Sequence, residues 1–441
     1  MTPQRQTTAL LSCLLASVAF PLMAQDHAAH HAHGHDSHEG HAAMAAAGVL
    51  GRYPMSRDAS GTSWQPDATP MDGIHFNRGR WSGMLHGSIV TASGDSEGPR
   101  GGGDAFTQSM AMAMAQRPLA GGTLGLRAMA SLDPWTMDKD GYGLLLQTGE
   151  TADGHVHLVD RQHPHDALME LSATWSLPLG GGDSMFVYAG LPGEPALGPP
   201  AFMHRLSAKD NPEAPLGHHW LDATHVTFGV VTAGWVHRDF KFEASAFNGR
   251  EPDQHRKDVE LRRFDSWSAR VSWNPGPQWS LQASHALLDS PEQLAPGVSV
   301  ARTTASVMHH RRLDTAGPQW RSTLAWGRNR KQGHPATDAW LLESALAWEN
   351  GWSAYGRAER DDKDELFDHH DPRHGVAFTV SKLTLGVVHE FAPLGPGRLG
   401  VGAQASLHRL PAAIEADYGG DPASWLLFVR WTLAGESPAT R

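Results

Sequence analysis

The sequence predicts an all-β protein: an antiparallel transmembrane β-barrel of the outer-membrane type, with about sixteen strands (range about 14–18) and a disordered, histidine-rich N-terminal tail. Three observations predict this fold. Many segments alternate apolar and polar side chains at period two, the connectors between them alternate between short and long, and an export signal precedes them all. Only 40% of the 441 residues are apolar, and past the N-terminus no apolar run approaches the roughly 18 residues that a spanning helix needs.

Residues 1–24 have the anatomy of a cleaved signal peptide. A basic residue lies near the start, an apolar stretch follows, and the small Ala24 precedes an expected cut before Gln25. The only cysteine, Cys13, lies inside the apolar stretch, so a lipoprotein signal is the alternative interpretation. A mature chain without cysteine excludes disulfides and thiolate ligands, and any soft metal ion must then bind histidine or methionine. The signal predicts export to the outer membrane of a Gram-negative bacterium.

Residues 25–50 form a low-complexity tail that cannot bury a core and is predicted to be disordered without a ligand. Imidazole suits Cu(II), Ni(II) and Zn(II), and several imidazoles on a flexible chain can wrap around an ion. The alternative is a solvating linker of biased composition. The candidate metal ligands of the tail are His27, His30, His31, His33, His35, His38 and His41.

Residues 51–80 are rich in Gly, Pro, Ser and Asp, which predicts an irregular periplasmic segment that plugs or flanks one mouth of the barrel. Residues 81–433 carry the alternating pattern of the barrel, and residues 434–441 form a polar C-terminal tail. In 266–273, for example, Trp267, Ala269, Val271 and Trp273 share one face. The expected strands are 81–92, 104–116, 122–132, 166–178, 184–190, 223–236, 239–248, 264–273, 278–288, 299–312, 318–330, 338–349, 352–361, 375–391, 398–409 and 424–433.

The connectors predict which rim of the barrel faces which side. Short and long connectors alternate, as in outer-membrane barrels, which places both termini on the short-turn rim. Several of the 16 tryptophans lie near strand ends, where an amphipathic ring can lie at the bilayer interface. A secreted soluble β-protein, such as a large sandwich or a propeller, is the alternative. The polar end of the chain also departs from the terminal aromatic residue that many such barrels have.

A second histidine cluster lies in the connector that precedes the strand expected at 166–178. Two imidazoles and a neighbouring carboxylate there can supply three metal ligands. Alternatively, its Asp–Arg and His–Asp pairs fasten a long loop, or an Asp/His dyad activates water. The candidate ligands are His155, His157, His163, His165 and Asp166.

The strand alternation also places histidine and methionine in the barrel lumen. If Leu85, Gly87 and Ile89 face lipid, then Met84 and His86, which alternate with them, face inward. The same argument applies near residue 308 and to His225 and His408. Thioether and imidazole suit Cu(I) and Cu(II), respectively, although either side chain can also be an ordinary barrel residue. The neighbours of the stripe at 110–114 are all alanine, so the pattern does not assign its face. The candidate lumenal ligands are Met84, His86, Met308 and His310.

Four stretches resemble a known family: YPMSRDASGTSWQPD (53–67), DRQHPHD (160–166), GEPALGPPAFMHR (193–205) and FNGREPD (247–253). They look like those of an uncharacterised family of proteobacterial outer-membrane β-barrel proteins found with copper or other heavy-metal resistance genes. The resemblance spans nearly the whole mature chain. It implies an outer-membrane location and a metal context, and it supplies no reaction or binding residues.

The first functional hypothesis is an outer-membrane barrel that binds or passes heavy-metal ions, with copper first and nickel or zinc as alternatives. The second is a general porin or structural barrel whose histidines are incidental, and the third is a barrel hydrolase. No enzymatic activity and no required cofactor are expected. The expected partners are outer-membrane lipids, metal ions and periplasmic metal-handling proteins. A net charge of -11 without a basic stripe argues against nucleic acid.

Overall fold

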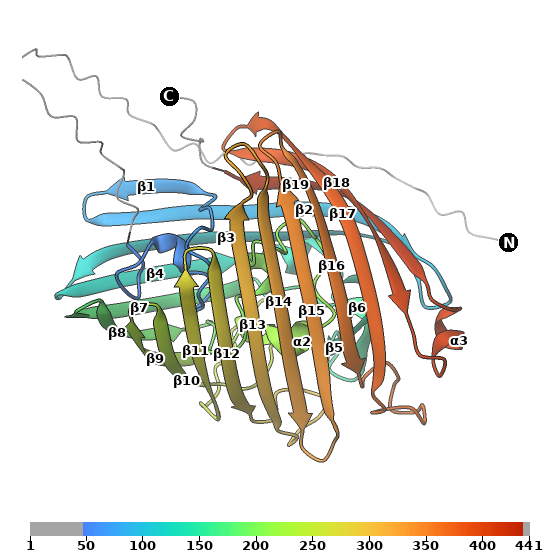
Figure 1. Cartoon of the computed structure of the whole chain (residues 1–441). Helices are drawn as coiled ribbons and strands as arrows, with labels where there is room; N and C mark the ends of the chain where they lie inside the picture. The colour runs from blue at the N-terminus through green and yellow to red at the C-terminus, as the bar shows by residue number, and fades with distance from the viewer. Residues whose placement is uncertain (1–46, 435–441) are drawn as a thin grey trace, which may run out of the picture. The chain divides into compact units, whose positions relative to one another are not determined.

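The computed structural model describes residues 47–434, in which sixteen strands close into an antiparallel barrel (Figure 1). Each strand pairs with the next one around the barrel, and β19 returns to pair with β2. The predicted fold class is therefore confirmed. The barrel strands are β2 (Trp81–Ser96), β3 (Gly102–Leu119), β4 (Gly122–Ala130), β7 (Leu168–Gly180), β8 (Asp183–Gly190), β9 (Val230–His237), β10 (Phe240–Phe247), β11 (Ser266–Gly276), β12 (Trp279–Leu288), β13 (Val300–Arg312), β14 (Gln319–Lys331), β15 (Ala336–Ala347), β16 (Trp352–Lys363), β17 (Phe378–Leu394), β18 (Gly397–Arg409) and β19 (Ala423–Leu433).

A further strand, β1 (Ile74–Arg78), lies outside the closed ring and pairs with the start of β2. The pairing of β19 with β2 ends at Ser88, so β1 continues the sheet beside β2 from Leu85 to Trp81. The composition of residues 51–80 predicted irregular backbone here. Five residues are too few for the alternation of Ile74 and Phe76 to stand out among turn-forming neighbours.

The two faces of the barrel wall differ as a membrane protein requires. Along β17, the side chains of Leu383, Leu385 and Val387 are exposed, whereas Lys382 and Thr384, which alternate with the two leucines, are buried. An apolar outer face and a polar inner face are what a bilayer demands of a barrel. Many exposed tryptophans lie near strand ends, among them Trp273, Trp279, Trp320, Trp340, Trp352 and Trp425.

Two long connectors fold into the barrel interior. Residues 131–167 contain α1 (Asp133–Thr136) and a hairpin of β5 (Tyr142–Thr151) and β6 (His157–Gln162), and residues 191–229 contain η2 (Phe202–His204), α2 (His218–Leu221) and η3 (Ala223–His225). Both connectors bond to inward-facing groups of the wall: Gly143 N donates to Asp104, and Leu216 N donates to Glu359. Figure 1 shows α2, β5 and β6 inside the ring of strands.

The strand expected at 223–236 begins only at Val230, so the sequence analysis was wrong for its first seven residues. Those residues hold η3 and pass through Gly229 at φ +107°, a conformation that L side chains rarely adopt. The remaining helical turns are η1 (Met55–Arg57) and α3 (Glu415–Tyr418). Within residues 47–434, no helix has the length and apolar character to cross a membrane.

Residues 47–73 fill the lumen at the short-turn rim. The backbone N–H of Ala68 donates to the carbonyl of Pro277, which lies in the turn between β11 and β12, and Trp64 is buried. Thr62 anchors the segment to the wall: its hydroxyl donates to Glu243 Oε2 at 2.5 Å and accepts from Arg270 Nη2 at 3.0 Å. The segment thus closes much of this mouth from inside.

We expect Thr62→Val to lower the free energy of unfolding by about 1–3 kcal/mol, because a similar shape would leave two buried charged groups without their hydroxyl partner. Urea unfolding of the detergent-folded protein measures this loss, and limited proteolysis measures release of residues 47–73. Thr69→Val is the control, since this threonine of the same segment lines a cavity instead. Equal midpoints for the two variants would contradict the anchoring role.

Candidate functional site

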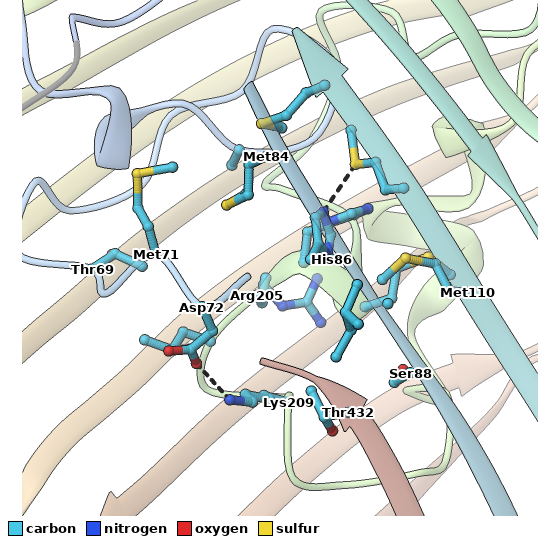
Figure 2. A pocket seen from close by; sticks show the side chains of 18 of the residues that line it. Thr69, Met71, Asp72, Met84, His86, Ser88, Met110, Arg205, Lys209 and Thr432 are labelled. Atoms are coloured by element: carbon cyan, nitrogen blue, oxygen red, sulfur yellow. Dashed lines mark hydrogen bonds and ion pairs between the residues drawn. The ribbon is translucent and has the colours of Figure 1, made fainter. Parts of the chain in front are cut away.

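A cavity of about 250 Å³ lies in the lumen between residues 47–73, the inner faces of β2, β3, β4 and β19, and loop residues 202–212 (Figure 2). The start of β2 and the end of β19 border it, which places it toward the short-turn rim. Of the 15 methionines of the chain, seven line this cavity: Met55, Met71, Met84, Met110, Met112, Met114 and Met203.

Strand alternation and register bring these side chains together. In β2, Met84 and His86 point inward, while Leu85 and Ile89 on the other face are exposed. The neighbouring β3 pairs its Met114 with Met84 and its Met112 with His86, so two stripes of possible ligands lie side by side. The structure thereby places the methionine stripe of 110–114, whose face the sequence left open, beside the lumenal cavity.

Two histidine–methionine pairs lie at the cavity. His86 Nε2 lies 3.1 Å from Met112 Sδ, and His204 Nε2 lies 3.3 Å from Met129 Sδ. Register joins the pairs, because Met112 faces Met129 across β3 and β4, and the two imidazole rings are 5.7 Å apart.

These distances fit the coordination of a soft metal ion. Metal–nitrogen and metal–sulfur bonds of about 2.0 and about 2.3 Å at a tetrahedral ion hold the two ligand atoms about 3.5 Å apart. The observed nitrogen–sulfur distances differ from that value by only a few tenths of an ångström. Two thioethers with two imidazoles are a donor set suited to Cu(I), or to its redox-inert analogue Ag(I).

The loop side of the site is held by a buried ion-pair network. His204 ends η2 next to Arg205, whose guanidinium donates to Glu343, Asp222 and the carbonyl of Pro200. Burial lowers the pKa of His204 well below its ordinary value, so the ring is neutral near pH 7. A neutral ring is the form that binds a metal ion.

An ion pair crosses one side of the cavity. Lys209 Nζ of the loop donates to Asp72 Oδ2 of the N-terminal segment at 2.6 Å (Figure 2). The nearby ammonium holds the pKa of Asp72 at about 2. The pair joins the two segments that close the cavity from opposite ends of the lumen.

The other lumenal candidates lie apart from this cavity. Met308 and His310 are buried on the inner face of β13, as the alternation predicted, but they do not line the cavity. His225 is buried in η3, and His408 on β18 is also buried, with its Nδ1 next to the carbonyl of Pro422.

The connector histidines do not converge on one point. His155 is exposed, His157 is half-buried, and His165 Nδ1 lies 2.9 Å from Asp133 Oδ2. His163 Nε2 lies 3.2 Å from Glu150 Oε1, and Asp166 pairs with Arg256 at 3.3 Å.

The pairs of His165, His163 and Asp166 hold the loop in place, as one alternative expected, and they leave the Nε2 atom of His165 unpaired within the described part of the chain. Between residues 47 and 434, three carboxylate or imidazole ligand atoms lie within 4.8 Å of one another only at Asp253, Asp258 and Glu260, an acidic loop cluster. His27, His30, His31, His33, His35, His38 and His41 lie outside the described residues.

Sequence reasoning missed Met129, Met203 and His204. A signal for the last two existed, because Met203 and His204 are adjacent within the stretch 193–205. Met129 lies on the inner face of a predicted strand, together with Arg127. It pairs across the sheet with Met112 of the methionine stripe.

The chain matches no family model and no curated protein. Among solved structures, it is similar to Salmonella typhi OmpF in complex with daunomycin, with 10% identity, 81% of this chain and 100% of that chain covered, and a TM-score of 0.50. The chain has the fold of an outer-membrane β-barrel. An anion-selective porin from Comamonas acidovorans (10% identity, 80% and 99% covered, TM-score 0.46) and the outer membrane channel DcaP of Acinetobacter baumannii (9% identity, 82% and 100% covered, TM-score 0.46) also match.

Proposed function

We propose that this protein is an outer-membrane barrel that binds heavy-metal ions, copper first, in a methionine- and histidine-lined lumenal site. The observation that carries the proposal is the pair of histidine–methionine contacts at His86 with Met112 and His204 with Met129. The histidine-rich tail gathers ions in the periplasm, and the cavity near the short-turn rim receives them.

The composition of the cavity argues against incidental packing. The interior of an outer-membrane barrel is ordinarily polar, and a general pore has no need of thioethers there. Here seven methionines surround one cavity, and two half-buried imidazoles point their Nε2 atoms at sulfur. Thioether ligands select soft ions such as Cu(I) over Mg²⁺ and Ca²⁺, which prefer oxygen.

The arrangement of the cavity supports ion binding as the primary activity, and passage of the ion through the barrel is a further step. Residues 47–73 and the loop at 191–229 meet around the cavity and are joined by the Lys209–Asp72 pair. An ion that crosses the barrel therefore needs one of these segments to move. Copper flux into liposomes, compared between the wild type and a cavity variant, tests this step, and equal fluxes would remove passage from the proposal.

Titration of Ag(I) in chloride-free buffer, and of Cu(I) under reducing conditions, tests binding. We expect His86→Ala/His204→Ala to lose one equivalent of tightly bound ion, or to bind it at least about 100-fold more weakly, since losing ligands costs no less than losing their supporting partners. His310→Ala is the matched control, because this histidine is also lumenal but lies outside the cavity. Retention of the full stoichiometry by the double variant would favour a general porin with incidental histidines.

A further inference from the structure

Five histidines gather behind the cavity, where the two inward-folded connectors meet. His163 and His165 come from one connector, and His218, His219 and His225 come from the other. The ring of His225 lies 5.2 Å from that of His218 and 5.7 Å from that of His165. His218 and His225 are no more than 5% exposed.

One nitrogen of each of three rings is held by an acceptor. His165 Nδ1 donates to Asp133 Oδ2 at 2.9 Å, His218 Nδ1 donates to Asp222 Oδ1 at 2.6 Å, and His225 Nδ1 donates to the carbonyl of Asp222 at 2.9 Å. A proton fixed on Nδ1 leaves the lone pair of a neutral ring on Nε2. Carboxylates and carbonyls that orient imidazoles in this way are the usual supporting partners of metal-binding histidines.

For two of these three rings, the opposite nitrogen is buried without a partner among the described residues. Within residues 47–434, the buried Nε2 atoms of His165 and His225 have no hydrogen-bond partner. Leaving a buried polar atom unpaired is costly, so such atoms call for a water molecule or an ion.

The spacing of the rings suits an ion. Two imidazoles bound at about 2.0 Å to one tetrahedral ion have ring centres about 5 Å apart. The two ring distances measured from His225 are close to this value. The three ligand nitrogens are not all within 4.8 Å of one another, so binding would draw the rings closer together.

We propose that His165, His218 and His225 form a second metal site, for a borderline divalent ion such as Zn(II), Ni(II) or Cu(II). The inference rests on the proposed metal-binding function, but it concerns a separate set of ligands. Imidazoles without thioethers favour borderline ions over soft ones. The Asp133 and Asp222 carboxylates beside the rings supply negative charge, and Asp222 also pairs with Arg205.

The second site adjoins the first. His165 and Phe202 line the methionine cavity, and the His165 ring also lies against Phe202 and His225. His165 therefore stands at the border between a soft site and a borderline site. An ion that enters from the short-turn rim meets the mixed methionine–histidine site first and the all-imidazole site second.

The test is a Zn(II) titration of the full-length chain in which the seven histidines of residues 25–50 are alanine, so that the tail contributes no imidazole. We expect one equivalent of bound Zn(II), which His165→Ala/His225→Ala abolishes or weakens at least about 100-fold. His408→Ala is the matched control, because its Nδ1 also bonds a carbonyl and its buried Nε2 is also unpaired. Full Zn(II) binding by the double variant would overturn the inference.

Two further readouts separate this inference from the proposed function. The His165→Ala/His225→Ala variant should keep its Ag(I) equivalent, and the His86→Ala/His204→Ala variant should keep its Zn(II) equivalent. If the His86→Ala/His204→Ala variant loses only Ag(I) binding, the methionine–histidine site is supported. The Zn(II) titration then decides the all-histidine site. If the His165→Ala/His225→Ala variant fails to fold, Co(II) is added instead to the chain whose tail histidines are alanine. It should then give the visible absorption of a tetrahedral, nitrogen-bound ion. The spectrum of hydrated Co(II) would overturn the inference.

Discussion

Replacing Arg205 with methionine is expected to lower the free energy of unfolding by about 3–5 kcal/mol and to release the loop at 191–229 from the lumen. The Arg205 side chain is fully buried, and its guanidinium makes two 3.1 Å bonds to the Glu343 carboxylate besides its bond to Asp222. Methionine of similar length would leave both carboxylates short of a positive partner. Glu343 keeps Arg357, so we expect the barrel itself to persist.

Urea unfolding in detergent or vesicles measures the loss, and limited proteolysis reports whether the loop becomes accessible. Arg205→Lys is the matched variant: it keeps the charge but cannot make the two-pronged contact with Glu343, so an intermediate loss is expected. Because His204 and Met203 precede Arg205 directly, Ag(I) binding should weaken together with loop release. An unfolding midpoint equal to that of the wild type would contradict the anchoring role of Arg205.

The barrel wall could be predicted because every second residue of a strand faces lipid and is therefore apolar. All sixteen expected strands correspond to observed ones, and most ends differ by a few residues. The exception at 223–236 is instructive. Val226 and Phe228 alternate with polar residues as in a strand, but they pack with Met112 and Met129 inside the lumen.

The inward-folded loops could not be predicted, because their partners lie far away in the sequence. Arg205 bonds to Glu343, 138 positions later, and Lys382 bonds to Glu213, 169 positions earlier. No local sequence pattern predicts such long-range pairs. A lumenal loop also has no lipid-facing side, so it carries no periodicity that would distinguish it from a solvated loop.

Only part of the candidate site could be predicted from the sequence, because the alternation orients strand residues but not loop residues. Alternation placed Met84 and His86 in the lumen, since leucine and isoleucine flank them on the other face. It could not orient the stripe at 110–114, whose neighbours are alanine. Only the register of β3 against β2 brings Met112 to His86, and only the loop brings His204 to Met129.

A positive charge at the middle of the outer face should cost far more than the same charge near its edge. Leu385 lies midway along β17 and is 60% exposed, and Leu394 ends the same strand with the same exposed fraction. We expect Leu385→Arg to lower the free energy of unfolding by about 2–4 kcal/mol in lipid vesicles, and Leu394→Arg by about 0–1 kcal/mol.

The physical reason is depth in the bilayer. Nine residues separate the two positions, which is about 30 Å along a strand and enough, even with the usual tilt, to reach the headgroups from the midplane. Urea unfolding in vesicles measures both losses, and Leu385→Ala gives the part due to lost apolar area. In water an exposed substitution has little effect, within about 0.5 kcal/mol, whatever its place on the strand. Small, equal losses at both positions would therefore mean that this face meets water, and the membrane-spanning interpretation on which both metal sites depend would fail with it.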